Sequence, residues 1–284
     1  MKSPVLSILF LLISVTLLAV PNDFRFRHFS VEDGLSSNSV RAIMQDKYGF
    51  LWIGTEEGLN RYDGIMIKSY SICPQAAGKY ISSLYGTKKN IWIGTDEGIY
   101  IYAYATETFT YFDLTTPNNV RITSIVNHIL QDKDGNLWFS TNGQGLFRYN
   151  LSKNYLEQYE FTSAFGIVAS TMADSDNQIW ALTNQGESGV YKLNKAENKF
   201  EPFGLLYNAG NHHSQALAML EDSEQTLWLG TWECGLQKID KYTRQTTTYL
   251  HPTDGKGVTH IHSLMEYAPH QLLIGSDDGL LLFN

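Results

Sequence analysis

Apolar and polar residues follow a pattern that recurs every 40 to 48 residues along this chain. Each repeat contains a short apolar strand centred on Trp and ending in Gly-Thr or a related pair, then a turn and a strand that begins with glycine. Leu273 takes the Trp position in the sixth repeat. A period of about 40–50 residues rich in short strands is typical of a β-propeller blade. The repeated tryptophans are Trp52, Trp92, Trp138, Trp180 and Trp228.

Each repeat predicts four strands. An inner strand such as 40–45 precedes the Trp strand, and a short aromatic or threonine-rich strand such as 67–70 follows the glycine-led one. Asp, Asn and Gly in the first turn, as in 46–49, favour tight hairpins. The second and third strands are apolar on both faces, as expected for a sheet packed between two others. We predict an all-β fold, a β-propeller of four-stranded blades with six repeats visible, in which the Trp rings pack between blades.

The two ends of the propeller leave two arrangements open. Residues 24–29 predict a fourth strand with no blade of its own, and the sixth repeat stops after its third strand. The ends could therefore share one blade and close a six-bladed ring, which would remove the open sheet edges. Alternatively, the chain is part of a seven-bladed propeller, with 24–29 belonging to a later blade.

The first twenty residues predict a secretory signal peptide. Lys2 precedes an uncharged and largely apolar run over 5–20, with the small residue Ala19 near its end. An uncleaved signal anchor is the alternative. The domain prediction is thus a signal peptide at 1–20 and a propeller sensor domain at 21–284. Beyond the signal segment we expect no membrane insertion.

The net charge limits the classes of binding partner, and the positions of the cysteines indicate whether disulfides form. The formal net charge is −8 and the basic residues form no stripe, which disfavours nucleic acid and anionic membrane surfaces. Cys73 and Cys234 occupy non-equivalent positions in different repeats, so free thiols are expected rather than a disulfide framework.

The segment 29–40, followed by 45–64, resembles the two-component regulator propeller repeat. The resemblance extends over all six repeats, with departures in the fourth at 181–182 and in the sixth at Leu273. It implies a periplasmic sensor of a hybrid two-component system, which responds to breakdown products of glycans and controls a histidine kinase outside this chain. It also implies seven-bladed propellers, and it suggests that this chain is the leading part of a longer sensor. Other sensor domains or a second sensor chain are the implied protein partners.

Candidate ligand-binding residues lie in the turns between second and third strands. In a propeller these turns share one face around the mouth of the central channel, and here they are acidic and rich in amides. Ordinary turn chemistry explains most of them, whereas a polar ring could also bind the hydroxyls of an oligosaccharide. Trp232 stands outside the repeated Trp position and could stack on a sugar. The candidate residues are Trp232, Glu233, Asn142, Gln144, Glu56 and Glu57.

We predict no metal, no cofactor and no catalytic residue. His260 and His262 would lie on one face of an inner strand, but satisfied core or channel histidines are the more common reading of such a pair. No nucleophile elbow, zinc-protease motif or phosphate loop is present. A propeller fold also supports lyases and hydrolases, so a polysaccharide lyase or glycoside hydrolase remains the alternative function.

Overall fold

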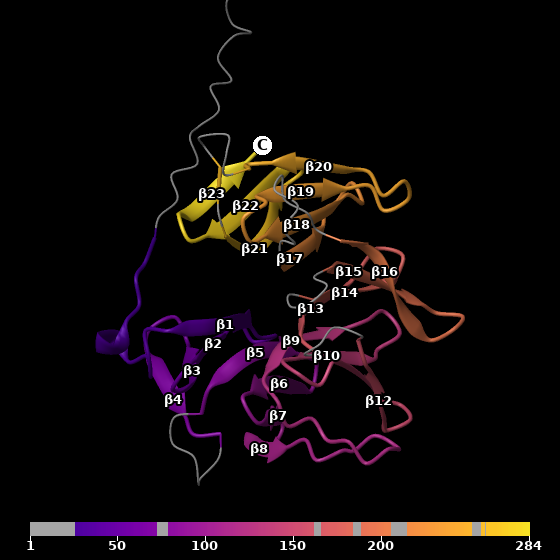
Figure 1. Cartoon of the computed structure of the whole chain (residues 1–284). Coiled ribbons are helices and arrows are strands. Elements are labelled where there is room, and N and C mark those ends of the chain that lie inside the picture. Colours follow the sequence, from indigo (N-terminus) through magenta and orange to yellow (C-terminus); the bar gives the residue numbers. More distant parts are fainter. Residues whose placement is uncertain are drawn as a thin grey trace, which may run out of the picture.

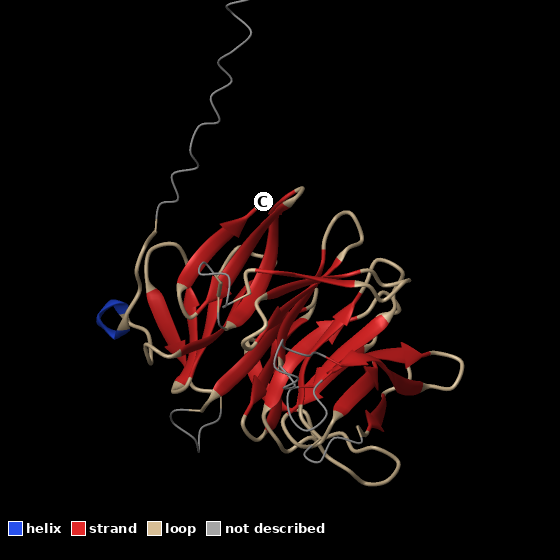
Figure 2. Ribbon diagram, turned by 45° about the horizontal axis from the view of Figure 1, so that its top comes forward, coloured by secondary structure: helices blue, strands red, loops and turns tan. Residues whose placement is uncertain are grey.

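The structure, a computed structural model, is an all-β protein (Figures 1 and 2). It describes residues 26–72, 79–161, 166–183, 189–205, 215–251, 257–258 and 260–284. Within these ranges the chain forms 23 strands and one short 3-10 helix, η1 (Val31–Asp33). The predicted signal peptide at 1–20 and Cys73 lie outside the described residues, so their predictions stay untested.

The strands form six antiparallel sheets in chain order, five of four strands and one of three. The first two sheets are β1 (Val40–Gln45), β2 (Leu51–Thr55), β3 (Gly58–Tyr62), β4 (Ile67–Tyr70), and β5 (Ile81–Gly86), β6 (Asn90–Thr95), β7 (Gly98–Ala103), β8 (Thr108–Tyr111). The next two are β9 (Val126–Gln131), β10 (Leu137–Thr141), β11 (Leu146–Asn150), β12 (Tyr155–Tyr159), and β13 (Val168–Ala173), β14 (Ile179–Thr183), β15 (Gly189–Asn194), β16 (Lys199–Leu205). The last two are β17 (Ala216–Glu221), β18 (Leu227–Thr231), β19 (Leu236–Ile239), β20 (Thr246–Tyr249), and β21 (Ile261–Ala268), β22 (Gln271–Ser276), β23 (Gly279–Phe283).

Each sheet is one propeller blade, and the first strand of each is the inner one. The inner strands β1, β5, β9, β13, β17 and β21 contact each other in that order around the axis, and Figure 1 shows the blades following the colour sequence around a common centre. The prediction of a β-propeller with six repeats is confirmed. Close approach of neighbouring blades depends on glycine, as expected from the Gly-Thr pairs: a Cβ on Gly54 would lie 2.5 Å from Ile81 Cγ2.

The repeated Trp rings are buried between blades, and an aspartate binds four of them. In the third blade the indole Nε1 of Trp138 donates to Asp132 Oδ2 at 2.8 Å, while Asp132 Oδ1 accepts the backbone N–H of Asn136 at 2.8 Å. One carboxylate therefore closes the first turn of the blade and holds the wedge residue. The same bond joins Trp52 to Asp46, Trp180 to Asp174, and Trp228 to Asp222.

The second blade lacks this bond. Its first turn carries Thr87 in place of an aspartate, and Thr87 Oγ1 accepts the backbone N–H of Asn90 at 3.0 Å. Trp92 Nε1 is buried without a hydrogen-bond partner. Trp92 is held instead by aromatic packing, with Phe112 and Phe139 at centroid distances of 5.4 and 5.7 Å.

The first and last blades each leave one apolar face uncovered. Leu280 on β23 is 52% exposed, whereas the equivalent Leu236 on β19 is fully buried. Ile43 on β1 is 62% exposed, whereas the equivalent Ile129 on β9 is 3% exposed. Among the described residues, β21 makes no contact with β1 comparable to those between the other successive inner strands. Within the described residues, the outer faces of the first and last blades do not pack on each other as successive blades do.

Residues 26–29 do not form the fourth strand predicted for segment 24–29. They have no strand structure, and they pack on the first blade: Phe29 lies 4.8 Å from the ring of Tyr62, and Arg27 donates to the Tyr62 hydroxyl at 2.5 Å. A cation–π contact between Arg27 and Phe29 at 4.7 Å adds to this packing. In the structure these four residues form no strand, and they contact the first blade through Arg27 and Phe29.

The Trp–Asp bond predicts a large effect of Asp132→Ala. The change leaves the buried Trp138 indole N–H and the Asn136 backbone N–H without their acceptor. The free energy of unfolding should therefore fall by about 2–4 kcal/mol. Urea denaturation measures it. Asp134→Ala, in the same turn but exposed, is the matched control and should cost less than about 0.5 kcal/mol. Equal losses in both variants would contradict this role.

The uncovered end face predicts unequal effects at two equivalent leucines. Leu236→Ser buries a hydroxyl in a packed interface and should cost about 2–5 kcal/mol. Leu280→Ser removes an apolar side chain from an exposed surface and should change stability by less than about 1 kcal/mol. Urea denaturation of both variants under the same conditions compares them. A comparable loss at Leu280 would show that another blade or another molecule covers this face in solution.

Candidate ligand-binding site at the channel mouth

A hydroxyl group fixes the turn that follows the second strand of every blade. In the first blade Thr55 Oγ1 donates to the carbonyl oxygen of Gly58 at 3.0 Å and accepts the backbone N–H of Glu57 at 3.2 Å. The hydroxyl bond recurs in all six blades, with Ser276 and Gly279 forming it in the last at 3.0 Å. The residue after this hydroxyl therefore has a fixed place on one rim of the propeller. That place is taken by Glu56, Asp96, Asn142, Trp232 and Asp277 in the described turns.

The inner strand supplies a second fixed position next to this one. Its pairing with the second strand is interrupted by one extra residue in every blade, for example between Val40 and Ala42. Such a bulge turns its side chain away from the regular alternation of the strand. The bulge residues are Arg41, Ser82, Asn127, Ala169, Leu217 and His262.

The two fixed positions form cation–carboxylate pairs in the first and last blades. In the first blade Arg41 Nε donates to Glu56 Oε1 at 3.0 Å, and this bond lowers the pKa of Glu56. In the last blade His262 Nε2 lies 2.7 Å from Asp277 Oδ1. Ser82 and Asn127 instead donate to backbone carbonyls of the next inner strand, at 2.8 and 2.9 Å.

Trp232 and two histidines meet Asp277 at the boundary between the fifth and sixth blades. Trp232 pairs with His260 through an isolated β-bridge, and their rings stack with centroids 3.7 Å apart and an interplanar angle of 29°. His260 Nδ1 contacts Asp277 Oδ2, the second oxygen of the carboxylate that His262 approaches. The hydrogen bonds with His260 and then His262 lower the pKa of Asp277.

This cluster offers a stacking surface beside a charged acceptor. Trp232 is 39% exposed, whereas the repeated Trp rings are buried. Each oxygen of the Asp277 carboxylate has a second lone pair that can accept a hydrogen bond from a ligand. Among the described residues, no set of three or more His, Cys, Asp or Glu side chains is placed to hold a metal ion.

The other candidate residues share the rim but do not join this cluster. Glu57 and Asn142 are exposed, and Glu233 adopts a positive φ of 69° in the turn after Trp232. Gln144 uses its amide group internally. Its Oε1 accepts the backbone N–H groups of Thr123 and Ser124 at 2.9 and 3.0 Å, and its Nε2 donates to the carbonyl oxygen of Arg121 at 2.9 Å. Gln144 thus holds a loop in place, and ligand binding by the six candidates remains a prediction.

Sequence reasoning identified Trp232 and the His260/His262 pair separately, and it missed that they form one cluster with Asp277. Two signals in the repeat alignment could have joined them. Trp232 and Asp277 occupy the same position in successive blades, and His262 occupies the bulge position next to it. His260 precedes the inner strand of one blade, where the turn of the previous blade approaches.

Comparisons with known proteins agree with this architecture. The model of the family described as "Two component regulator propeller" matches residues 34–57 and 120–143. These two segments are thus similar to the two-component regulator propeller repeat. A segment of 68 residues is 46% identical to histidine kinase P4 of Formosa agariphila, and it covers 24% of this chain and 5% of that kinase.

Solved structures with the same fold include the extracellular domain assigned to a two component system and a lyase. The extracellular domain assigned to a hybrid two component system of B. thetaiotaomicron superposes with a TM-score of 0.75 at 24% identity, over 91% of this chain and 35% of that one. Virginiamycin B lyase of Staphylococcus aureus superposes with a TM-score of 0.62 at 15% identity, over 86% of this chain and 84% of the lyase. At these identities the likeness shows the propeller fold alone. In the described ranges, no helix has the length and apolar character needed to cross a bilayer.

The lowered pKa of Asp277 predicts a pH-dependent effect of Asp277→Asn. A carboxylate with a lowered folded-state pKa stabilises the fold above its ordinary pKa of 3.8, and this contribution is lost as the pH falls through the lowered value. The difference in melting temperature between wild type and variant should therefore be constant from about pH 5.5 to 4.5 and shrink toward about pH 2.5. Calorimetry across this range measures it. A difference that grows with acidity would contradict the pairing.

Proposed function

We propose that this chain is the ligand-sensing propeller of an exported two-component sensor, and that it binds oligosaccharide fragments at the channel mouth around Trp232. Ligand binding would control a histidine kinase, with the propeller itself non-catalytic and located in the periplasm. The regulator propeller repeats and the similarity to part of a histidine kinase support the sensor role. The exposed Trp232 beside Asp277 is the observation that supports an oligosaccharide as the ligand.

The chemistry of this cluster suits a sugar. The C–H face of a pyranose ring packs on an indole, while its hydroxyl groups donate to a carboxylate. His260 stacks on Trp232 and also contacts Asp277, so the aromatic surface and the acceptor are held in a fixed relation before a ligand arrives. A site that is already ordered loses less conformational entropy on binding.

The rim around this cluster extends the polar surface. Further ion pairs lie at equivalent turns of the first two blades. They join Glu56 to Arg41 and Glu97 to Lys79. A chain of several sugar units could contact more than one of these turns. The other sensor domains, or a second sensor chain, are the proposed partners through which such binding would reach the kinase.

The proposal predicts that Trp232→Ala weakens binding of an oligosaccharide by at least about tenfold, equal to about 1.4 kcal/mol, because exposed Trp side chains at binding sites contribute about that much or more. Isothermal titration calorimetry with a panel of plant and host oligosaccharides measures it. Tyr242→Ala is the matched control, because Tyr242 is an exposed aromatic residue in the turn after β19 and should leave binding unchanged.

Two results would contradict the proposal. The first is an affinity that Trp232→Ala leaves unchanged, which would place any sugar site elsewhere. The second is the appearance of new reducing ends or unsaturated products when the purified chain is incubated with polysaccharide, which would favour the lyase or hydrolase alternative.

A further inference from the structure

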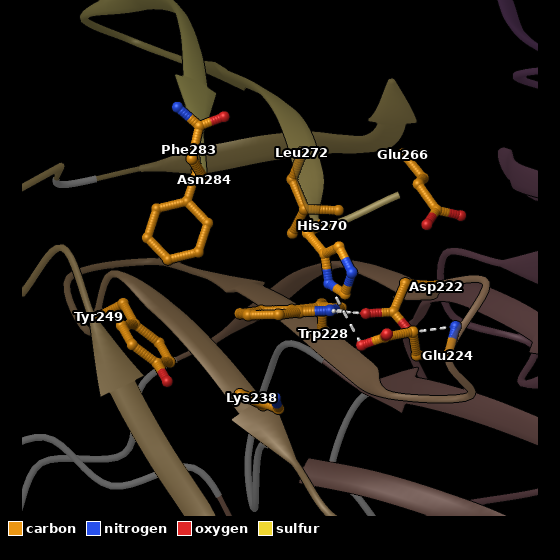
Figure 3. A pocket seen from close by; sticks show the side chains of 10 residues that line it. All are labelled: Asp222, Glu224, Trp228, Lys238, Tyr249, Glu266, His270, Leu272, Phe283 and Asn284. Carbon is orange, nitrogen blue, oxygen red and sulfur yellow. Dashed lines mark hydrogen bonds and ion pairs between the residues drawn. The ribbon is translucent and has the colours of Figure 1, made fainter. Parts of the chain in front are cut away.

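In the first, third, fourth and fifth blades a cation on the third strand lies opposite the repeated Trp. Figure 3 shows this arrangement in the fifth blade, where Lys238 lies next to the Trp228 ring, and Tyr249 of the fourth strand is 5.9 Å from the same ring. The cations are 5.2 to 5.8 Å from the centroids of the indoles. The pairs are Arg61 with Trp52, Arg148 with Trp138, Lys192 with Trp180, and Lys238 with Trp228.

In the third blade the fourth strand provides a carboxylate for this cation. Glu157 lies directly opposite Arg148 in the sheet, and Arg148 Nη2 donates to Glu157 Oε2 at 2.5 Å. The hydroxyl of Tyr159 donates to the same oxygen at 3.0 Å. The Arg148 guanidinium lies 5.6 Å from the centroid of the Tyr159 ring. A carboxylate therefore fits between an arginine on the third strand and a tyrosine on the fourth.

In the first blade the same arginine and tyrosine are present without this carboxylate. Arg61 lies opposite Lys68 in the sheet, and Tyr70 has the place of Tyr159, with its ring centroid 5.5 Å from the guanidinium. Arg61 Nε is buried and has no hydrogen-bond partner within the described residues. A buried charged donor without an acceptor is unfavourable, so the position favours binding of an anion.

Arg61 borders a pocket between the first and second blades. Its volume of about 230 Å³ is below the roughly 300–1,000 Å³ of sites for drug-sized ligands, so it suits a small molecule. The hydroxyl of Tyr104 is a second buried group here that lacks a hydrogen-bond partner among the described residues. Burial, and then the nearby charge of Asp46, raises the pKa of Tyr104 to about 12, so this hydroxyl stays protonated. The aromatic residues of the lining are Tyr48, Phe50, Trp52, Tyr102 and Tyr104.

The other charged groups at this pocket are compatible with an anion. Asp46 already accepts three N–H donors, from the Trp52 indole and from two backbone groups of its own turn. Glu107 has an exposed side chain in the turn between β7 and β8. Lys47 Nζ lies 4.7 Å from the centroid of the Tyr104 ring, so a second cation stands beside the pocket.

We propose that this pocket binds a small organic acid, with its carboxylate on Arg61 and its apolar part against the aromatic rings. The carboxylate would take the place that Glu157 has beside Arg148 in the third blade. Arginine suits this role because its planar fork of N–H donors matches a carboxylate. The pocket lies at the rim formed by the first and third turns of the blades, opposite the channel mouth. The proposal is therefore independent of sugar binding around Trp232.

Binding is tested with sodium butyrate and the full chain labelled with ¹⁵N-tryptophan. The indole N–H of Trp52 donates to Asp46 Oδ2 at 2.7 Å, so its NMR signal reports on the pocket. Butyrate should shift this signal in a saturable manner and leave that of Trp180 unchanged. Butyramide has no charge and formate has no apolar part, so each should bind at least about tenfold more weakly. Sodium chloride at equal ionic strength corrects for screening.

Variants separate the pocket from general charge effects. Arg61→Gln should weaken butyrate binding at least about tenfold, whereas Lys238→Gln, at the equivalent position of the fifth blade, should not change it. Lys68→Glu places a carboxylate opposite Arg61, as Glu157 is placed opposite Arg148. This variant should have a raised melting temperature and bind butyrate at least about tenfold more weakly. If Arg61→Gln does not fold, Lys68→Glu alone decides.

L-2-Aminobutyrate distinguishes two sources of the carboxylate. If it binds more tightly than butyrate, and Glu107→Gln removes the difference, the ligand is an amino acid whose ammonium group contacts Glu107. If butyrate binds at least as tightly, the ligand is a simple carboxylic acid. No saturable shift of the Trp52 signal overturns the proposal. Equal binding of butyrate and butyramide overturns it as well, as does butyrate binding that Lys68→Glu leaves unchanged.

Discussion

The hydrogen bond between an aspartate and the repeated tryptophan is the constraint on which this propeller depends. The indole has to be buried to fill the wedge between two blades, and its N–H has to find an acceptor there. The aspartate at the first turn supplies that acceptor and at the same time closes the hairpin that presents the Trp strand. Blade folding and blade packing are therefore set by one side chain, as Asp132 and Trp138 show.

The same repetition creates the functional positions. Because a hydroxyl fixes the second turn and a bulge interrupts the inner strand, each blade whose second turn is described places two side chains at known points on one rim. The first three blades have polar residues at these points, and Arg41 with Glu56, Ser82 and Asn127 bond within the protein. The fifth and sixth blades fill them with Trp232, His262 and Asp277, and an exposed aromatic ring meets a charged acceptor there. In this fold the side chains at the equivalent turn and bulge positions differ between blades and determine the binding properties of the rim, while the backbone scaffold is the same in each blade.

Much of the fold could be predicted from the sequence, because the Trp period directly reflects the packing that the blades require. The four-strand blade and the burial of Trp52 and Trp180 follow from it. Details that depend on contacts between blades could not be predicted. Residues 26–29 have the composition of a strand, yet in the structure they form none and Phe29 packs on Tyr62. Gln144 has the composition of a ligand-binding residue, yet its amide group is bonded to the backbone of a neighbouring loop.

The central claim, that carboxylate-bound indoles hold the blades together, is tested most directly by the indole N–H signals of ¹⁵N-tryptophan-labelled protein. Charge-assisted hydrogen bonds are short and strong, so the account predicts four downfield signals, from Trp52, Trp138, Trp180 and Trp228, set apart from that of Trp92. A Trp92 signal at the same position as these four would contradict it.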